Sequence, residues 1–186
     1  MTKDEFTTWL HEQGKKKIKE KIDNMRENVK NILVASFYKE TQVGRSIGSS
    51  NKQKKRVNPK EFKRELLHSI TRLRKLVDDK TIQNLDIRNE IGSLSNKTGV
   101  SIGQSQKVIN VYLKFYCLFM DSSIEIIKEL DCPLDSTTME KKQKMKNLTD
   151  IKEYKKWQDK FEIEFGIRLL RDWEYDSNRM KLSFED

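Results

Sequence analysis

The sequence predicts an all-α fold, a compact single-domain helical bundle built around one central buried helix. The 186 residues include only two prolines, so few positions interrupt a helix. Apolar residues recur at three- and four-residue spacing along most of the chain, and β-like alternation is scarce. Charged residues reach 36% and apolar residues 35%, as expected for helices with one buried stripe and a charged outer surface. We therefore expect a single domain over residues 1–186.

The N-terminal part of the chain is predicted to hold one long helix and one loop. Helical spacing over residues 3–40 is set by Ile18, Ile22, Met25, Val29, Ile32 and Leu33. Residues 41–58 break this pattern with glycines, serines and the run Lys54, Lys55, Arg56. Such a composition favours a mobile basic loop.

The next two helices follow this loop. One begins at Pro59, because proline suits the first helical position and Asn58 can cap the helix N-terminus. Its buried stripe is predicted from Phe62, Leu66, Leu67, Ile70, Leu73 and Leu76. A shorter helix covers residues 81–94, and a turn over residues 95–103 follows it.

The central helix is predicted over residues 104–120. It is so apolar that we expect it to be buried on nearly every side. On a helical wheel, Lys107, Asn110 and Lys114 share one stripe, with Val111 and Leu118 among them. A stripe of this kind usually faces solvent, but in a cleft the desolvated amine of Lys107 could act as a nucleophile.

The segment Cys132-Pro133-Leu134-Asp135 follows a helix predicted over residues 122–130. Proline fixes the approach of the chain, so we expect Asp135 at the start of a further helix. There it could be a simple N-cap. The same position keeps the carboxylate ionised, and an oriented anion can stabilise a developing positive charge. A last long helix spans residues 149–174, and residues 176–186 form a frayed tail.

The charge of the chain predicts a polyanionic partner. The net charge is +9, and residues 1–60 hold 15 basic and 7 acidic side chains. Nucleic acid is the usual partner for such a bias.

The two cysteines and two histidines lack the spacing of a disulfide framework or a metal site. Without an apolar leader or a membrane span in the sequence, we expect a cytoplasmic monomer that uses neither a membrane nor a small-molecule cofactor.

Residues 99–135 resemble the helix-hairpin-helix DNA glycosylases, and most of all the archaeal 8-oxoguanine branch. In these enzymes a glycine-containing hairpin leads into a helix that carries a lysine near its start. A Pro-hydrophobic-Asp motif then places an aspartate at the next helix N-terminus. Here the hairpin corresponds to GVSIG at residues 99–103, the lysine to Lys107 and the aspartate to Asp135.

The resemblance implies that the protein flips a damaged or modified base out of double-stranded DNA and cleaves its N-glycosidic bond. Asp135 and Lys107 would be the catalytic residues, acting either through a Schiff base on Lys107 or through water. DNA contacts are expected from Gly99, Ser101, Gly103, Gln104 and Ser105, together with Lys54, Lys55 and Arg56. Asn110, Lys114 and Trp157 would line the base pocket, although Trp157 also fits an ordinary core position. Either repair or defence against phage with modified DNA fits this activity.

Two other classes of protein remain open from the sequence. A non-enzymatic DNA-binding or phage-regulatory protein would account for the basic N-terminal third, but it gives no role to the polar stripe or to Asp135. A helical ribonuclease toxin pairs an arginine with a histidine, and Arg64 and His68 come near that spacing on one helix.

Overall fold

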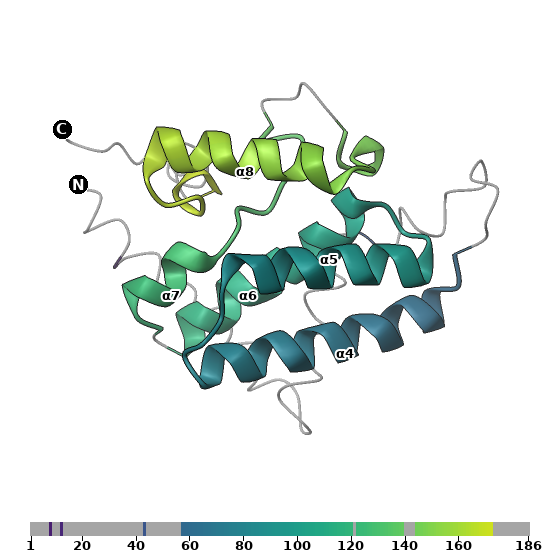
Figure 1. Ribbon diagram of the computed structural model, residues 1–186, viewed down its shortest axis with the longest axis horizontal. Helices are drawn as coiled ribbons and strands as arrows, with labels where there is room; N and C mark the ends of the chain where they lie inside the picture. Colours follow the sequence, from purple (N-terminus) through teal and green to yellow (C-terminus); the bar gives the residue numbers. More distant parts are fainter. Residues whose placement is uncertain are drawn as a thin grey trace.

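The computed structural model describes residues 57–120, 122–139 and 144–172, together with Thr8, Glu12 and Val43. Over these residues the protein is all-α, which confirms the predicted fold class. The elements in chain order are α4 (Pro59–Asp78), α5 (Asn84–Thr98), α6 (Ile102–Phe119), α7 (Ile124–Glu129), the 3-10 helix η1 (Met145–Asn147) and α8 (Ile151–Phe165). Figure 1 shows these elements packed into one compact body.

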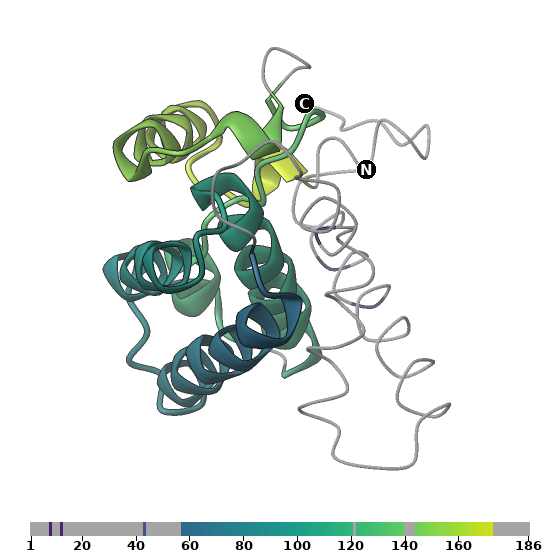
Figure 2. The ribbon, with the colours of Figure 1, turned by 90° about the vertical axis from the view of Figure 1, so that its right-hand side faces the viewer.

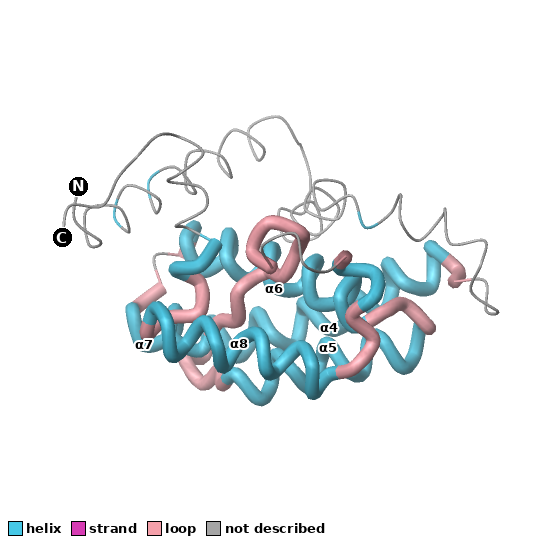
Figure 3. Tube along the Cα trace, turned by 90° about the horizontal axis from the view of Figure 1, so that it is seen from above, coloured by secondary structure: helices cyan, strands magenta, loops and turns pink. Residues whose placement is uncertain are grey.

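Helix α6 is the centre of the bundle. It contacts every other described helix, η1 included, and Figure 2 shows α8, α5 and α4 arranged along one side of it. Helices α4 and α5 lie antiparallel beside each other, and α8 lies on the far side of α5 from α4 (Figure 1). Seen from above, α6 lies behind these three helices (Figure 3). The buried apolar side chains of α6 are Ile102, Val108, Ile109, Tyr112, Leu113, Tyr116 and Cys117. The prediction of a central buried helix is confirmed.

Local sequence signals set the ends of several helices as expected. The Asn58 side chain accepts hydrogen bonds from the amides of Lys60 and Glu61, so it caps α4 at Pro59. Helix α5 runs to Thr98, four residues beyond the predicted end at residue 94, and closes on Gly99. Gly99 has a φ of 71°, a left-handed conformation that glycine adopts without a steric penalty.

Three expectations about the elements are wrong. The helix predicted over residues 149–174 ends at Phe165, because Gly166 adopts a φ of 72° and terminates it. No continuous helix starts at Asp135, since residues 136–139 form only a single turn closed by the Met139 amide on the Asp135 carbonyl. Val43, predicted to lie in a mobile loop, is helical and completely buried.

Other predictions fall outside the described residues. They concern nearly all of the helix over residues 3–40, of which Thr8 and Glu12 are helical. They also include the rest of the loop up to residue 56 and the tail 176–186. Among the helices that are described, none is both long and apolar enough to cross a membrane.

Candidate active site

Lys107 and Asp135 form an ion pair at the edge of the bundle. The Lys107 Nζ lies 3.1 Å from the Asp135 Oδ2, although 28 residues separate them in the chain. Lys107 projects from the second turn of α6, and Asp135 ends the extended segment that follows α7. Their side chains are 20% and 30% exposed, respectively. The pair is therefore held by the fold and remains reachable from solvent.

The Asp135 carboxylate is held on both of its oxygens. Its Oδ1 accepts hydrogen bonds from the amides of Thr137 at 2.8 Å and Thr138 at 3.1 Å, while Oδ2 faces Lys107. Burial raises the pKa of Asp135, but the Lys107 ammonium and the two amides together lower it by more. The net pKa therefore lies below its usual value. Asp135 is consequently an oriented anion at neutral pH.

Two glutamines hold the extended segment that carries Asp135. From α6, Gln106 accepts a hydrogen bond from the Leu134 amide at 3.0 Å and donates one to the Leu134 carbonyl at 2.7 Å. From α8, Gln158 makes the same two bonds with the backbone of Cys132, each 2.8 Å long. Each side-chain amide thus pairs with the backbone as a neighbouring strand would. Asp135 follows directly after this clamped segment.

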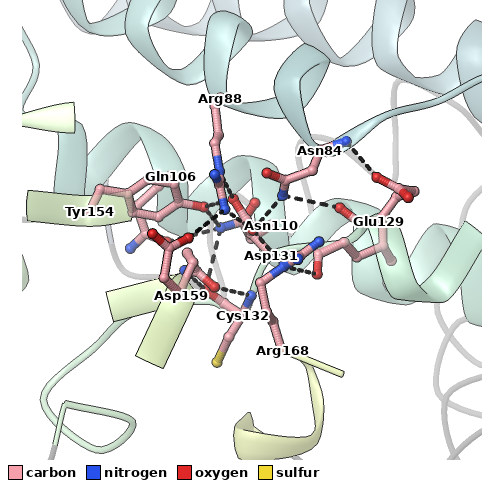
Figure 4. A network of polar contacts seen from close by, with 12 residues as sticks. Asn84, Arg88, Gln106, Asn110, Glu129, Asp131, Cys132, Tyr154, Asp159 and Arg168 are labelled. Carbon is pink, nitrogen blue, oxygen red and sulfur yellow. Dashed lines mark hydrogen bonds and ion pairs between the residues drawn. The ribbon is translucent and has the colours of Figure 1, made fainter. Parts of the chain in front are cut away.

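A buried carboxylate, Asp131, anchors the start of the same segment (Figure 4). Its side chain is fully buried and pairs with Arg168 at 2.9 Å and with Arg88 at 3.2 Å. It also accepts hydrogen bonds from the Tyr154 hydroxyl at 2.8 Å and from the Asn84 side chain at 2.5 Å. Two cations and two neutral donors compensate the cost of burying this charge.

Asp131 and the two glutamine clamps were not predicted from the sequence. Two of the partners of Asp131 lie far from it in the sequence: Asn84 is 47 positions before it, and Arg88 is 43 positions before it. No short-range spacing connects such residues. A weak signal was present, because Gln106 and Gln158 stand at positions that the apolar pattern of α6 and α8 assigns to the core.

The backbone amides of the five residues between 99 and 105 that are predicted to contact DNA all donate hydrogen bonds within the chain. The Gly103 amide donates to the Leu148 carbonyl at 2.8 Å. The other pairs are Gly99 with the Ser95 carbonyl, Ser101 with the Gln104 Oε1, Gln104 with the Ser101 Oγ, and Ser105 with the Ser101 carbonyl. Ser101, Gln104 and Ser105 are also buried. These amides would have to exchange existing hydrogen bonds to reach a phosphate, so they do not form a preformed anion site.

The three residues predicted for a base pocket do not share one pocket. Asn110 is buried and donates to the Gln106 side chain and the Tyr154 hydroxyl. Lys114 is buried and pairs with Asp172 at 2.5 Å. Trp157 is half-buried and lines a shallow hollow on α8 with Glu153, Lys156 and Lys160. Asn110 and Lys114 are both buried and belong to the polar interior of the bundle.

The remaining residues of interest are the predicted DNA-contacting residues 54–56, Cys132 and the possible metal ligands. Lys54, Lys55 and Arg56 lie outside the described residues. Cys132 is buried, and this burial raises the pKa of its thiol well above the usual value, so the thiol is unreactive. In the described ranges, no group of three or more acidic, histidine or cysteine side chains could hold a metal ion.

Comparison of the chain with protein families, with curated proteins and with solved structures finds no significant match. The functional argument therefore depends on the geometry of the residues themselves. Lys107 and Asp135 are brought together, and a buried network fixes the segment that carries the aspartate. The chemistry that this arrangement offers is a fixed, solvent-accessible anion beside a cation.

Proposed function

We propose that the protein is a DNA glycosylase in which Asp135 is the catalytic carboxylate and Lys107 its cationic partner. The observation that supports this most strongly is the 3.1 Å contact between the two side chains. The resemblance of residues 99–135 to the helix-hairpin-helix glycosylases assigns catalytic roles to the same two residues. The protein would act on double-stranded DNA, with the target nucleotide flipped out of the helix.

In the proposed reaction, the bond between the sugar C1′ and the base breaks, and its electron pair leaves with the base, which takes up a proton. Positive charge develops on the deoxyribose ring as this bond lengthens. The Asp135 carboxylate stabilises that charge, because the Thr137 and Thr138 amides already hold it in one orientation. A water molecule then adds to C1′ and releases a proton, leaving an abasic site.

The ion pair favours water over Lys107 as the nucleophile. The Asp135 carboxylate engages the Lys107 amine at 3.1 Å, so attack by this amine on the sugar would require the ion pair to break. We therefore expect a monofunctional enzyme. Borohydride should trap no covalent adduct between the protein and its DNA substrate. An adduct that forms with the wild type and disappears in Lys107→Gln would instead identify Lys107 as the nucleophile.

The function is tested by incubating the protein with a panel of duplex DNAs and measuring released bases by mass spectrometry. The panel includes oxidised, alkylated and uracil-containing duplexes and hypermodified phage DNA, so a positive result also separates repair from antiviral defence. We expect one class of base to be released and abasic sites to accumulate in that DNA. DNA binding without release of any base would instead support a non-enzymatic DNA-binding protein.

A further inference from the structure

The backbone of η1 lies directly against the first turn of α6 at Gly103. The Gly103 amide donates to the Leu148 carbonyl at 2.8 Å. A Cβ atom at Gly103 would lie 1.8 Å from the Met145 carbonyl oxygen and 3.0 Å from the Leu148 Cβ. Only glycine permits such a close approach of two backbones. The 3-10 turn is therefore docked onto α6 through backbone atoms on both sides.

This docking places η1 beside the Lys107–Asp135 pair. Gly103 and Lys107 are four residues apart in α6, so they share one helix face with about 6 Å between them. Gln106 connects the same parts of the molecule, because its side-chain amide donates to the Gly103 carbonyl at 2.9 Å and to the Leu134 carbonyl at 2.7 Å. Asp135 follows Leu134 directly. The docked turn and the ion pair consequently occupy neighbouring positions at the start of α6.

The docked turn carries cationic charge. Lys144, which directly precedes η1, is exposed, and no acidic side chain in the described part of the chain lies within ion-pair distance of it. Lys146 belongs to η1 itself, so two of the four residues 144–147 are lysines. The acid that follows, Asp150, uses its side chain to cap α8 through the Lys152 amide.

We propose that η1 is the surface that binds the sugar–phosphate backbone of DNA next to the target nucleotide, with Lys144 as a cation that contacts phosphate. In this arrangement Gly103 contributes by docking η1 rather than by donating its own amide to phosphate. A lysine at this position neutralises one phosphate and releases its counterions, without reading the base sequence. The inference depends on the proposed function for the identity of its partner.

The test measures duplex DNA binding by fluorescence anisotropy at several salt concentrations for Lys144→Gln. Lys75→Gln is the matched control, because Lys75 is an equally exposed lysine in the last turn of α4, at the other end of the bundle from η1 (Figure 1). We expect Lys144→Gln to raise Kd severalfold and to reduce the slope of log K against log salt by about 0.9, the loss of one phosphate contact. Lys75→Gln should behave as the wild type does. Equal effects of the two substitutions would overturn the proposal.

A second variant tests the docking without changing any charge. Gly103→Ala places a methyl group against the Met145 carbonyl and should displace η1. It is expected to weaken DNA binding to an extent similar to Lys144→Gln, with helix content retained by circular dichroism. Wild-type DNA affinity in a folded Gly103→Ala protein would argue against the proposal.

The result for this surface can be separated from that for the proposed enzyme. Lys144-dependent DNA binding without release of any base would leave η1 as a DNA-binding surface and refute the glycosylase. Base release with unchanged DNA affinity in Lys144→Gln would support the glycosylase and overturn the role of η1.

Discussion

Two aspartates only four positions apart illustrate how the surroundings of a residue determine its role. Asp131 is completely buried between Arg88 and Arg168, so its carboxylate forms ion pairs inside the protein and is not accessible to a substrate. Asp135 is partly exposed and pairs with a single lysine. Only Asp135 can face a substrate, because access to a reacting sugar requires an exposed carboxylate. The catalytic proposal therefore concerns Asp135, while Asp131 maintains the segment that carries it.

Lys107→Gln should raise the pKa of Asp135. The ammonium is the largest of the groups that lower this pKa, and the Thr137 and Thr138 amides remain after the substitution. Because the folded-state pKa is lowered, the stabilisation by Lys107 is present above the unfolded value of 3.8 and is lost as pH falls through the folded pKa. Carbon-detected NMR titration of the Asp135 carboxyl measures the shift.

The accompanying stability measurement uses the same two proteins. The difference in unfolding free energy between wild type and Lys107→Gln should be constant near neutral pH and should shrink as the pH falls below about 4. An unchanged Asp135 pKa in Lys107→Gln would show that the ion pair is not maintained in solution.

Asp131→Asn should be strongly destabilising. It leaves the buried guanidinium groups of Arg88 and Arg168 without their shared carboxylate, and breaking a buried pair in this way costs about 3–5 kcal/mol. Asp159→Asn is the matched control, since Asp159 is 47% exposed and lies 3.9 Å from Arg88. That change should cost less than about 1 kcal/mol. Urea denaturation compares the two, and a similar small loss in both would contradict the anchoring role of Asp131.

At the scale of elements, the functional geometry depends on how an irregular segment is attached to regular helices. Residues 131–134 form neither helix nor strand, yet their backbone is paired on one side by α6 and on the other by α8. Gln106 and Gln158 provide this pairing with their side-chain amides. The segment is thus as fixed as a strand in a sheet, although the described residues contain no strand.

Gln106→Met should test this attachment. Methionine preserves much of the side-chain volume but leaves the buried amide and carbonyl of Leu134 without their partner, at a cost of about 1–3 kcal/mol for each unpaired group. A lower urea midpoint with an unchanged m value is expected. Faster hydrogen exchange at the Leu134 amide would localise the effect. Unchanged exchange at Leu134 would show that the clamp does not hold this segment.

Amphipathic spacing and end signals account for the elements that the sequence predicts well. The apolar stripe of α4, its Asn58 cap and the burial of α6 follow from local patterns, and each is confirmed. The end of α8 was missed because Gly166 follows helical spacing but adopts a left-handed φ. The proximity of Lys107 to Asp135 was expected from the resemblance. The residues that enforce it act across 26 to 47 positions, and no local pattern encodes such contacts.

At the scale of the whole molecule, positive charge is concentrated in the N-terminal third of the sequence. The chain carries +9, and residues 1–60 account for +8 of it, so residues 61–186 are close to neutral. General attraction to a polyanion is thus expected from the N-terminal third. Near the ion pair, Lys144 beside η1 is an exposed cation. We therefore expect the N-terminal third to attract DNA over long range, and the lysine beside η1 to position the DNA strand at the site.

The central claim is that Asp135 stabilises the positive charge that develops on the deoxyribose as the base departs, and single-turnover base release by Asp135→Asn tests it most directly. Asparagine keeps the size of the side chain and an oxygen that can accept the Thr137 and Thr138 amides. On the substrate found in the panel, we predict that base release falls roughly 10²- to 10³-fold, as for the loss of one oriented electrostatic stabiliser. DNA affinity measured in parallel should stay within about twofold of wild type, because Asp135 is proposed to act on charge that develops only in the transition state. Wild-type rates of base release in Asp135→Asn would contradict the claim and reduce Asp135 to the cap of a turn.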